Sequence, residues 1–196
     1  MEENSSSQEL QYKRIDKASG EILTYMDHRR QGLVKSLATR WTKLNQSIMG
    51  GLEWGTIVTI GGMSGSGKSS IANELETSLF DENPEETFSV LSFNFEMLAM
   101  KQVGRKISSK MQKTVSELYS STESLTDTDF DVAKELVQQD ISKYDIYYVD
   151  VPGTVEQVYN TIMRFHEEQL RKKGDDYGSV IFNIAILVRF HLYNKF

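Results

Sequence analysis

A glycine- and serine-rich stretch at residues 61–70 carries the clearest chemistry in the sequence. It fits the pattern G-x-x-x-x-G-K-S from Gly62 to Ser69. Glycines let the backbone curl until successive N–H groups point at one phosphate, and a helix that begins at the loop adds a favourable dipole. In such a loop the lysine reaches the β- and γ-phosphates, and the next hydroxyl holds Mg²⁺. The pattern predicts a nucleoside triphosphate site; the alternative is a flexible glycine-serine turn.

The predicted site uses nine consecutive residues. Lys68 is expected to act in catalysis as well as in phosphate binding, and the Ser69 hydroxyl is the expected Mg²⁺ ligand. The residues expected to contact the nucleotide, for which we take ATP, are Gly62, Met63, Ser64, Gly65, Ser66, Gly67, Lys68, Ser69 and Ser70.

The elements that must position this loop can be read from the hydrophobic pattern. A strand is predicted over residues 56–60, before the loop, and a helix after it. Further strands are expected at 88–94, 145–149 and 179–188, with helices over about 100–118, from Thr126 and from Thr154. Methionines on the first of these helices are expected to fill the core, and Trp41 and Trp54 to pack. Alternating strands and helices indicate an α/β domain with a largely parallel sheet.

Hydrolysis requires a carboxylate that orients water, and a second one near the metal ion. Glu96 follows the strand at 88–94, so it would lie near the γ-phosphate if that strand neighbours the loop strand. Otherwise it is a surface glutamate at a helix start. Asp150 ends the strand at 145–149, which fits a Mg²⁺ carboxylate in form, but it also fits a turn residue before Pro152-Gly153.

The composition is that of a globular domain with an acidic balance. The chain of 196 residues has a formal net charge of −6 and no cysteine. The charge offers no general basic surface for nucleic acid, although a local basic groove is compatible with it. Without cysteine, disulfides and thiolate metal sites are excluded. The polar N-terminus is unlike a signal peptide, and the apolar run 180–188 is too short to span a bilayer, so we expect a cytoplasmic protein without membrane contact.

Three segments are expected along the chain. Residues 1–20 are polar and predict a disordered tail, and residues 21–37 predict a linker helix. That helix could pack on its own domain or reach a neighbouring subunit. Residues 38–196 form the predicted nucleotide-binding domain.

With these residues in place, the chain resembles the ATPase domain of replicative helicases of the DnaB type, in the RecA-like superfamily. Residues 36–55 are similar to the family's lead-in, with Arg40 for a glycine and Asn45 for an aspartate. Phe93-Asn94-Phe95-Glu96-Met97 resembles the family's Phe-Ser-Leu-Glu-Met motif, whose glutamate is catalytic. The resemblance covers about residues 33–165.

The resemblance implies a RecA-like P-loop core, a mostly parallel sheet flanked by helices, with ATP and Mg²⁺ as cofactors. It implies catalytic roles for Lys68 and Glu96, single-stranded DNA as a partner and a homo-oligomeric, hexameric ring. The implied function is ATP hydrolysis coupled to translocation on single-stranded DNA and duplex unwinding.

Several family features are not found. The family's magnesium-binding strand ends in an aspartate, whereas the corresponding position here is Asn183 or has no counterpart, and no Asp or Glu follows Asp176. On this view Asp150 is not the metal ligand. The phosphate-sensing glutamine, DNA-binding loops and arginine finger are also missing. We therefore expect a domain incomplete at its C-terminal side, from a truncated or frameshifted gene or as a degenerate fragment, with nucleotide binding and weak or no hydrolysis.

Two other functions fit the loop. One is a catalytically incomplete nucleotide-binding module that joins a helicase ring. The other is a P-loop small-molecule kinase, which would need an arginine-bearing lid and an acceptor pocket that the sequence does not show clearly.

Overall fold

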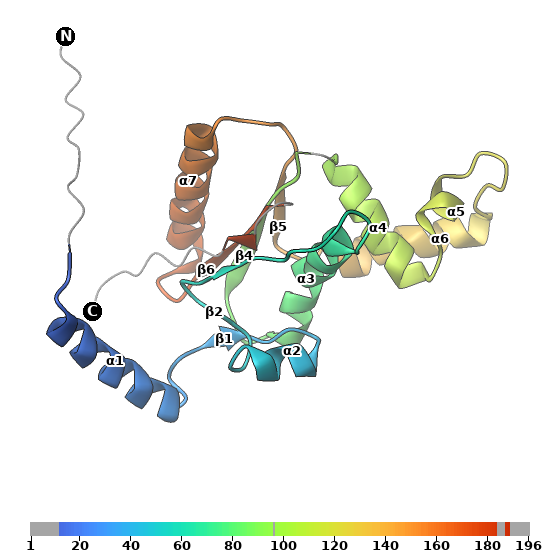
Figure 1. The fold of residues 1–196 in the computed structure, drawn as a ribbon. Helices are drawn as coiled ribbons and strands as arrows, with labels where there is room; N and C mark the ends of the chain where they lie inside the picture. Colours follow the sequence, from blue (N-terminus) through green and yellow to red (C-terminus); the bar gives the residue numbers. More distant parts are fainter. Residues whose placement is uncertain (1–11, 96, 184–186, 189–196) are drawn as a thin grey trace, which may run out of the picture. The chain divides into compact units, whose positions relative to one another are not determined.

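The computed structural model describes residues 12–95, 97–183 and 187–188. The chain divides into two compact units, Met1–Lys35 and Ser36–Phe196. Figure 1 shows the elements along the chain. The helices are α1 (Ile15–Arg30), α2 (Thr42–Ser47), α3 (Lys68–Glu82), α4 (Ala99–Met111), α5 (Val115–Tyr119), α6 (Asp127–Glu135), the π-helix η1 (Leu136–Ile141) and α7 (Val155–Lys173). The strands are β1 (Ser36–Leu37), β2 (Leu52–Glu53), β3 (Ile57–Val58), β4 (Phe88–Phe93), β5 (Ile146–Val149), β6 (Gly178–Asn183) and β7 (Leu187–Val188).

The described part of the first unit contains α1, which starts and stops earlier than the linker helix predicted over residues 21–37. Residues 15–20, assigned to the tail, belong to the helix, while residues 1–11 lie outside the described part of the chain. The helix ends because Gly32 takes a φ of +71°, and the Leu33 amide then donates to the His28 carbonyl at 2.9 Å. Leu37 belongs to the second unit and is fully buried in β1.

The second unit begins with a small lead-in structure, in which β1 pairs antiparallel with β2. Asn45, inside α2 of the intervening segment, accepts bonds from the Thr39 amide at 2.9 Å and the Thr39 hydroxyl at 2.7 Å. Its own amide donates to the Thr39 carbonyl at 2.7 Å. These bonds close the turn around α2, so Asn45 has a structural role here.

The main sheet has the strand order β3-β7-β6-β4-β5. Its centre is parallel, since β4 pairs in parallel with both β5 and β6, whereas β7 pairs antiparallel with β6 and β3. The α/β class is thus confirmed. Two expectations were wrong in detail: the strand predicted over 56–60 is only β3, and the run 179–188 is divided between β6 and β7.

Helices cover both faces of β4, every residue of which is buried. On one face Leu75 and Leu79 of α3 pack with Val90 and Val180, and Trp41 and Trp54 pack against the same cluster as expected. On the other face Ile162 and Phe165 of α7 pack with Leu91, Phe93 and Ile181. Figure 1 shows α3 and α7 on opposite sides of β4 and β6.

The helix predicted over residues 100–118 is two helices, α4 and α5. Gln112 ends α4 with a φ of +54°, and Thr114 then starts α5 with a capping box to Glu117. The expected burial of methionines is also wrong for Met100, which is 64% exposed. The helices α6 and α7 start after Thr126 and Thr154 as predicted, and each of these residues forms a capping box.

Candidate functional site

The glycine loop connects β3 to α3, and its glycines give it a curled backbone. Gly65 and Gly67 have φ values of +78° and +90°, which favour glycine strongly. The Ser66 amide donates to the Met63 carbonyl at 3.2 Å, closing a turn inside the loop. Residues 61–66 are exposed, and α3 starts directly at Lys68. An anion can therefore reach the loop amides and the positive end of α3 together.

Lys68 lies across this loop. Its ammonium donates to the carbonyls of Gly62 and Met63, at 2.8 and 2.9 Å. A Cβ added at Gly62 would lie 2.5 Å from the Ser66 hydroxyl, so a side chain at that position would force the Ser66 side chain to move. Ser69 is half-buried in the first turn of α3. The lysine, the hydroxyl and the loop backbone thus lie within one short segment, and they fit a magnesium-bound triphosphate.

No group of three or more acidic or histidine side chains within the described residues could hold a metal ion. A magnesium ion at this loop would therefore be held by the Ser69 hydroxyl, the phosphates and water, which is a common arrangement for Mg²⁺.

The predicted catalytic residue Glu96 lies outside the described residues. Glu96 was expected near the γ-phosphate if β4, the strand before it, neighbours β3, the strand before the glycine loop. The two strands are not neighbours, because β6 and β7 separate β4 from β3 in the sheet. The described residue before it, Phe95, is 36% exposed and contacts Phe93, with ring centroids 5.9 Å apart.

Asp150 has a defined partner at the carboxyl end of β5. Its carboxylate accepts a hydrogen bond from the Ala99 amide at 3.1 Å. Ala99 is the first residue of α4, and Leu98 before it offers no side-chain cap. Asp150 therefore caps a helix from a neighbouring strand, a contact that neither a metal ligand nor a simple turn residue requires.

Six buried polar residues, here called the polar ring, connect α3, β4 and α4. Asn73 donates to the Gln102 side chain at 2.9 Å, Gln102 to Asn94 at 3.1 Å, and Asn94 to the Ser92 hydroxyl at 3.1 Å. Ser92 donates to the Glu76 carboxylate. Lys106 closes the ring with bonds of 2.9 Å to both Glu76 and the Asn73 carbonyl.

Burial sets the electrostatics of the ring. The Lys106 and Glu76 side chains are 3% and 4% exposed. Burial lowers the pKa of Lys106, against the opposing effect of the Glu76 charge. The Tyr148 hydroxyl also donates to Glu76, at 3.1 Å, and burial followed by the Glu76 charge raises the pKa of Tyr148. The Glu76 carboxylate thus has three donors, which offset the cost of its burial.

The polar ring was not predicted from the sequence. The apolar residues at helical spacing from Met100 onward predict a core-facing side of α4 that does not include Gln102 or Lys106. The structure instead buries Gln102, Gly104 and Lys106. A signal for the ring is present in the spacing of its polar residues. Gln102 and Lys106 lie on one face of α4, and Asn73 and Glu76 lie on one face of α3.

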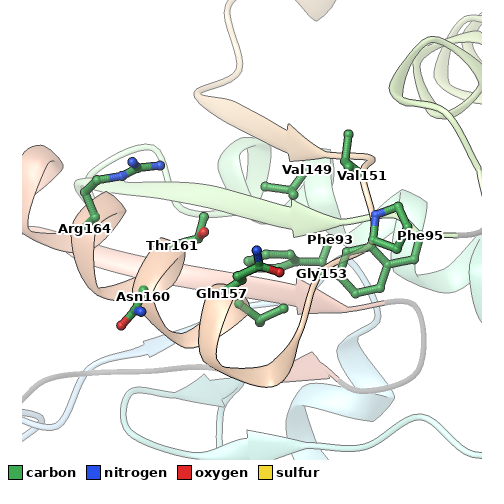
Figure 2. Close-up of a pocket in the computed structure, with 11 residues that line it drawn as sticks. Phe93, Phe95, Val149, Val151, Gly153, Gln157, Asn160, Thr161 and Arg164 are labelled. Atoms are coloured by element: carbon green, nitrogen blue, oxygen red, sulfur yellow. The ribbon is translucent and has the colours of Figure 1, made fainter.

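A cavity of about 440 Å³ lies at the carboxyl ends of β4 and β5, beside α7. Figure 2 shows Phe93, Phe95, Val149 and Val151 from the strand ends facing polar side chains of α7. Those side chains are Gln157, Asn160, Thr161 and Arg164. No residue of the glycine loop lines the cavity, and α7 covers the sheet face opposite α3. The cavity and the predicted nucleotide site are thus separate features.

The end of β6 lies at the same edge of the sheet. Its last residue, Asn183, is paired in register with Phe93 of β4, and β6 and β4 are parallel. The residue at this strand end is an amide in place of the carboxylate expected for a magnesium-binding strand.

A match to one family model identifies the family of this chain. No curated protein matches the chain. Among the described residues, no helix is long and apolar enough to cross a membrane. The family model of the DnaB-like helicase C terminal domain matches residues 36–179. The match covers most of the chain, from the first residue of the second unit to the start of β6. The chain therefore belongs to the DnaB-like helicase C-terminal domain family.

Proposed function

We propose that this chain is an ATP- and Mg²⁺-binding domain of a DnaB-type replicative helicase, with weak hydrolysis by the chain alone. The observation that carries the proposal is the loop at Gly62–Ser69, which curls in front of α3 with Lys68 lying across it. The family match supports nucleotide use in general.

The loop residues have separate roles in binding the phosphates and Mg²⁺. Backbone amides from Gly62 to Gly67 cradle the phosphates, and Met63, Ser64 and Ser66 supply three of them. Lys68 neutralises the β- and γ-phosphates, and the Ser69 hydroxyl coordinates Mg²⁺. Ser70 contributes an amide in the first turn of α3, where the helix dipole favours negative charge.

In the assembled protein, Glu96 orients the attacking water, and ATP hydrolysis drives translocation on single-stranded DNA and duplex unwinding. The active assembly is a homo-oligomeric ring, a hexamer as in the family. Family membership and the glycine loop support this assignment.

Two observations favour weak turnover, as in a nucleotide-binding module within a ring. The strand end that supplies a carboxylate in the family carries Asn183. The strand that leads to Glu96 is separated from the loop strand by two others. Both features weaken the positioning of water and metal without affecting the loop itself.

The test compares Mg²⁺-ATP affinity with turnover, with and without single-stranded DNA. Lys68→Ala is expected to lower ATP affinity at least about tenfold, because it removes a charged hydrogen-bond donor to phosphate. The matched control is Lys172→Ala, an exposed lysine in the last turn of α7. Equal ATP affinity of the wild type and Lys68→Ala would contradict the nucleotide site.

The variant Glu96→Gln tests whether ATP hydrolysis depends on the Glu96 carboxylate, because it keeps the size of the side chain and removes its charge. Slow hydrolysis that disappears in this variant supports the proposal. Robust DNA-stimulated hydrolysis that Glu96→Gln abolishes would show a complete motor instead. Phosphoryl transfer to a small molecule would identify a kinase.

A further inference from the structure

The cavity at the carboxyl ends of β4 and β5 has two walls of different chemistry. One wall is apolar and comes from the strand ends, with Phe93, Phe95 and Val151 among its residues. The other is a single stripe of α7 from Gln157 to Arg164, since its polar lining residues lie at positions i, i+3, i+4 and i+7 of the helix. Figure 2 shows the two walls facing each other. A ligand that fits both walls has an apolar body and a polar edge.

The polar wall offers hydrogen-bond donors and a positive charge. The Gln157 side-chain oxygen accepts from the Thr154 amide at 2.8 Å in the capping box of α7, so its own amide hydrogens are what it offers to a ligand. Among the described residues that line the cavity, Arg164 is the only charged one. Its ion pair with Glu168 is loose, at 3.9 Å with both side chains more than half exposed. The wall therefore favours a ligand that is rich in acceptors and carries negative charge.

The apolar wall is open to a flat ligand. Val151 is 69% exposed and Phe95 is 36% exposed, whereas Phe93 is buried. The rings of Phe93 and Phe95 lie edge to face, with centroids 5.9 Å apart. A planar aromatic ring can stack on such a surface. Unpaired nucleobases are recognised in this way, by stacking on aromatic side chains and by hydrogen bonds to their edges, which amide side chains supply well.

Size and charge narrow the ligand further. The cavity of about 440 Å³ is within the range of small-ligand sites. Gln157 and Arg164 lie two helical turns apart, about 10 Å along the axis of α7. This separation is comparable to the span from base to phosphate in one nucleotide. A single arginine, without a glycine loop in the described lining, suits one phosphate group and not a triphosphate.

We propose that this cavity is a second nucleotide site, which binds a nucleoside monophosphate unit. The base lies against the apolar wall with its polar edge at Gln157 and Asn160, and Arg164 pairs with the phosphate. The unit is either a free nucleotide or one nucleotide of single-stranded DNA, and the test separates these sources. The site goes beyond the proposed triphosphate site, because no residue of the glycine loop lines the cavity.

The experiment titrates the full chain with AMP and measures affinity by calorimetry. Excess Mg²⁺-tripolyphosphate is present in one series, because it can occupy the glycine loop but has no base to fill the cavity. AMP affinity is expected to be equal in both series. In NMR spectra, the side-chain amide signals of Gln157 and Asn160 are expected to shift as AMP is added. Adenosine, which lacks the phosphate, should bind about tenfold more weakly than AMP.

The variant Arg164→Ala is expected to lower AMP affinity about tenfold, because it removes the charged donor to the phosphate. Arg171→Ala is the matched control. Arg171 lies on the same helix outside the cavity lining, and its pair with Glu167 is equally loose, at 3.8 Å with both side chains exposed. Its removal should leave AMP affinity unchanged. Val151→Asp, at an exposed position of the apolar wall, adds a like charge and should also lower AMP affinity at least about tenfold.

Titration with oligothymidylate separates the two sources of the nucleotide. If Arg164→Ala weakens both AMP and oligothymidylate, the site takes a nucleotide of the strand; if it weakens AMP alone, the site takes a free nucleotide. Equal AMP affinity of wild type and Arg164→Ala would overturn the proposal. So would displacement of AMP by tripolyphosphate, which would place AMP in the glycine loop, or Arg164-dependent binding of an acidic peptide without binding of AMP. If ATP does not bind but AMP binds through Arg164, the proposed function fails and this site stands.

Discussion

Lys106 of α4 and Glu76 of α3 form an ion pair of 2.9 Å in which both side chains are almost completely buried. A buried pair of this kind joins its two helices only while both partners are present, because a single charge left behind has no water to solvate it. The pair belongs to the polar ring that connects α3, β4 and α4.

Removing one partner is therefore expected to destabilise the fold. We expect Lys106→Met to lower the free energy of unfolding by about 3–5 kcal/mol, since Glu76 would remain charged, buried and without its cation. Lys106→Met with Glu76→Gln should recover much of the loss. Urea unfolding measures both.

Lys110→Met is the control for this prediction. Lys110 lies on the same helix and its pair with Asp140 spans 3.7 Å with both side chains partly exposed, so we expect a change below about 1 kcal/mol. Equal losses for Lys106 and Lys110 would show that burial of the first pair has no energetic consequence.

Gly51, in the lead-in turn, is expected to be intolerant of any side chain. A Cβ there would lie 2.3 Å from the Leu37 carbonyl oxygen, which is backbone and cannot move aside, and φ is +143°. Gly51→Ala should cost about 3 kcal/mol or more, from strain and overpacking together. Gly50→Ala is the comparison, because φ is +106° there but nothing lies within 4 Å of the added Cβ. A thermal melt in which Gly50→Ala is the more damaging substitution would contradict the close approach.

Stability is expected to fall as the pH falls below about 6.5, through His166. Burial lowers the pKa of His166, although Glu167 opposes this, and its ring nitrogen lies 3.0 Å from the Ser179 hydroxyl. Above its ordinary pKa both states are neutral at this residue. Below it the unfolded chain binds a proton that the folded chain resists, so acid favours unfolding.

The measurement is the urea midpoint at about pH 7.5 and about pH 5.5, on either side of the ordinary histidine pKa. The wild type should lose stability between them, and His166→Gln should lose less. If the urea midpoints of the wild type and His166→Gln fall equally between the two pH values, other groups cause the acid sensitivity.

Ser69 is expected to act through the metal ion. We expect Ser69→Ala to raise the Mg²⁺ concentration needed for half-maximal ATP binding, because a metal ligand is removed. ATP affinity in the presence of a chelator should not change. If it falls by the same factor without Mg²⁺, the hydroxyl contacts phosphate and the metal assignment is wrong.

Much of the fold could be predicted because its signals are local. The helix after the glycine loop, the buried run at β4 and the capping boxes at Thr126 and Thr154 all depend on neighbours in the sequence. The glycine loop itself could be predicted for the same reason.

The errors concern contacts between distant segments. The place of β3 at the end of the sheet depends on pairing with β7, more than a hundred residues away. The buried face of α4 was misread because Gln102 and Lys106 are polar, and polar residues are buried only where partners such as Asn94 and Glu76 come from other elements. The capping role of Asp150 likewise requires the position of α4.

Four hydrogen bonds of the polar ring run in one direction, from Asn73 through Gln102, Asn94 and Ser92 to Glu76, and Lys106 donates to both ends of this series. Gln102, Asn94 and Ser92 each accept from one neighbour and donate to the next, so a change of residue type at one of these positions leaves a mismatched neighbour on each side. These positions should therefore be inherited together: a relative that replaces Gln102 should also replace Asn73 or Asn94, whereas single replacements should be rare.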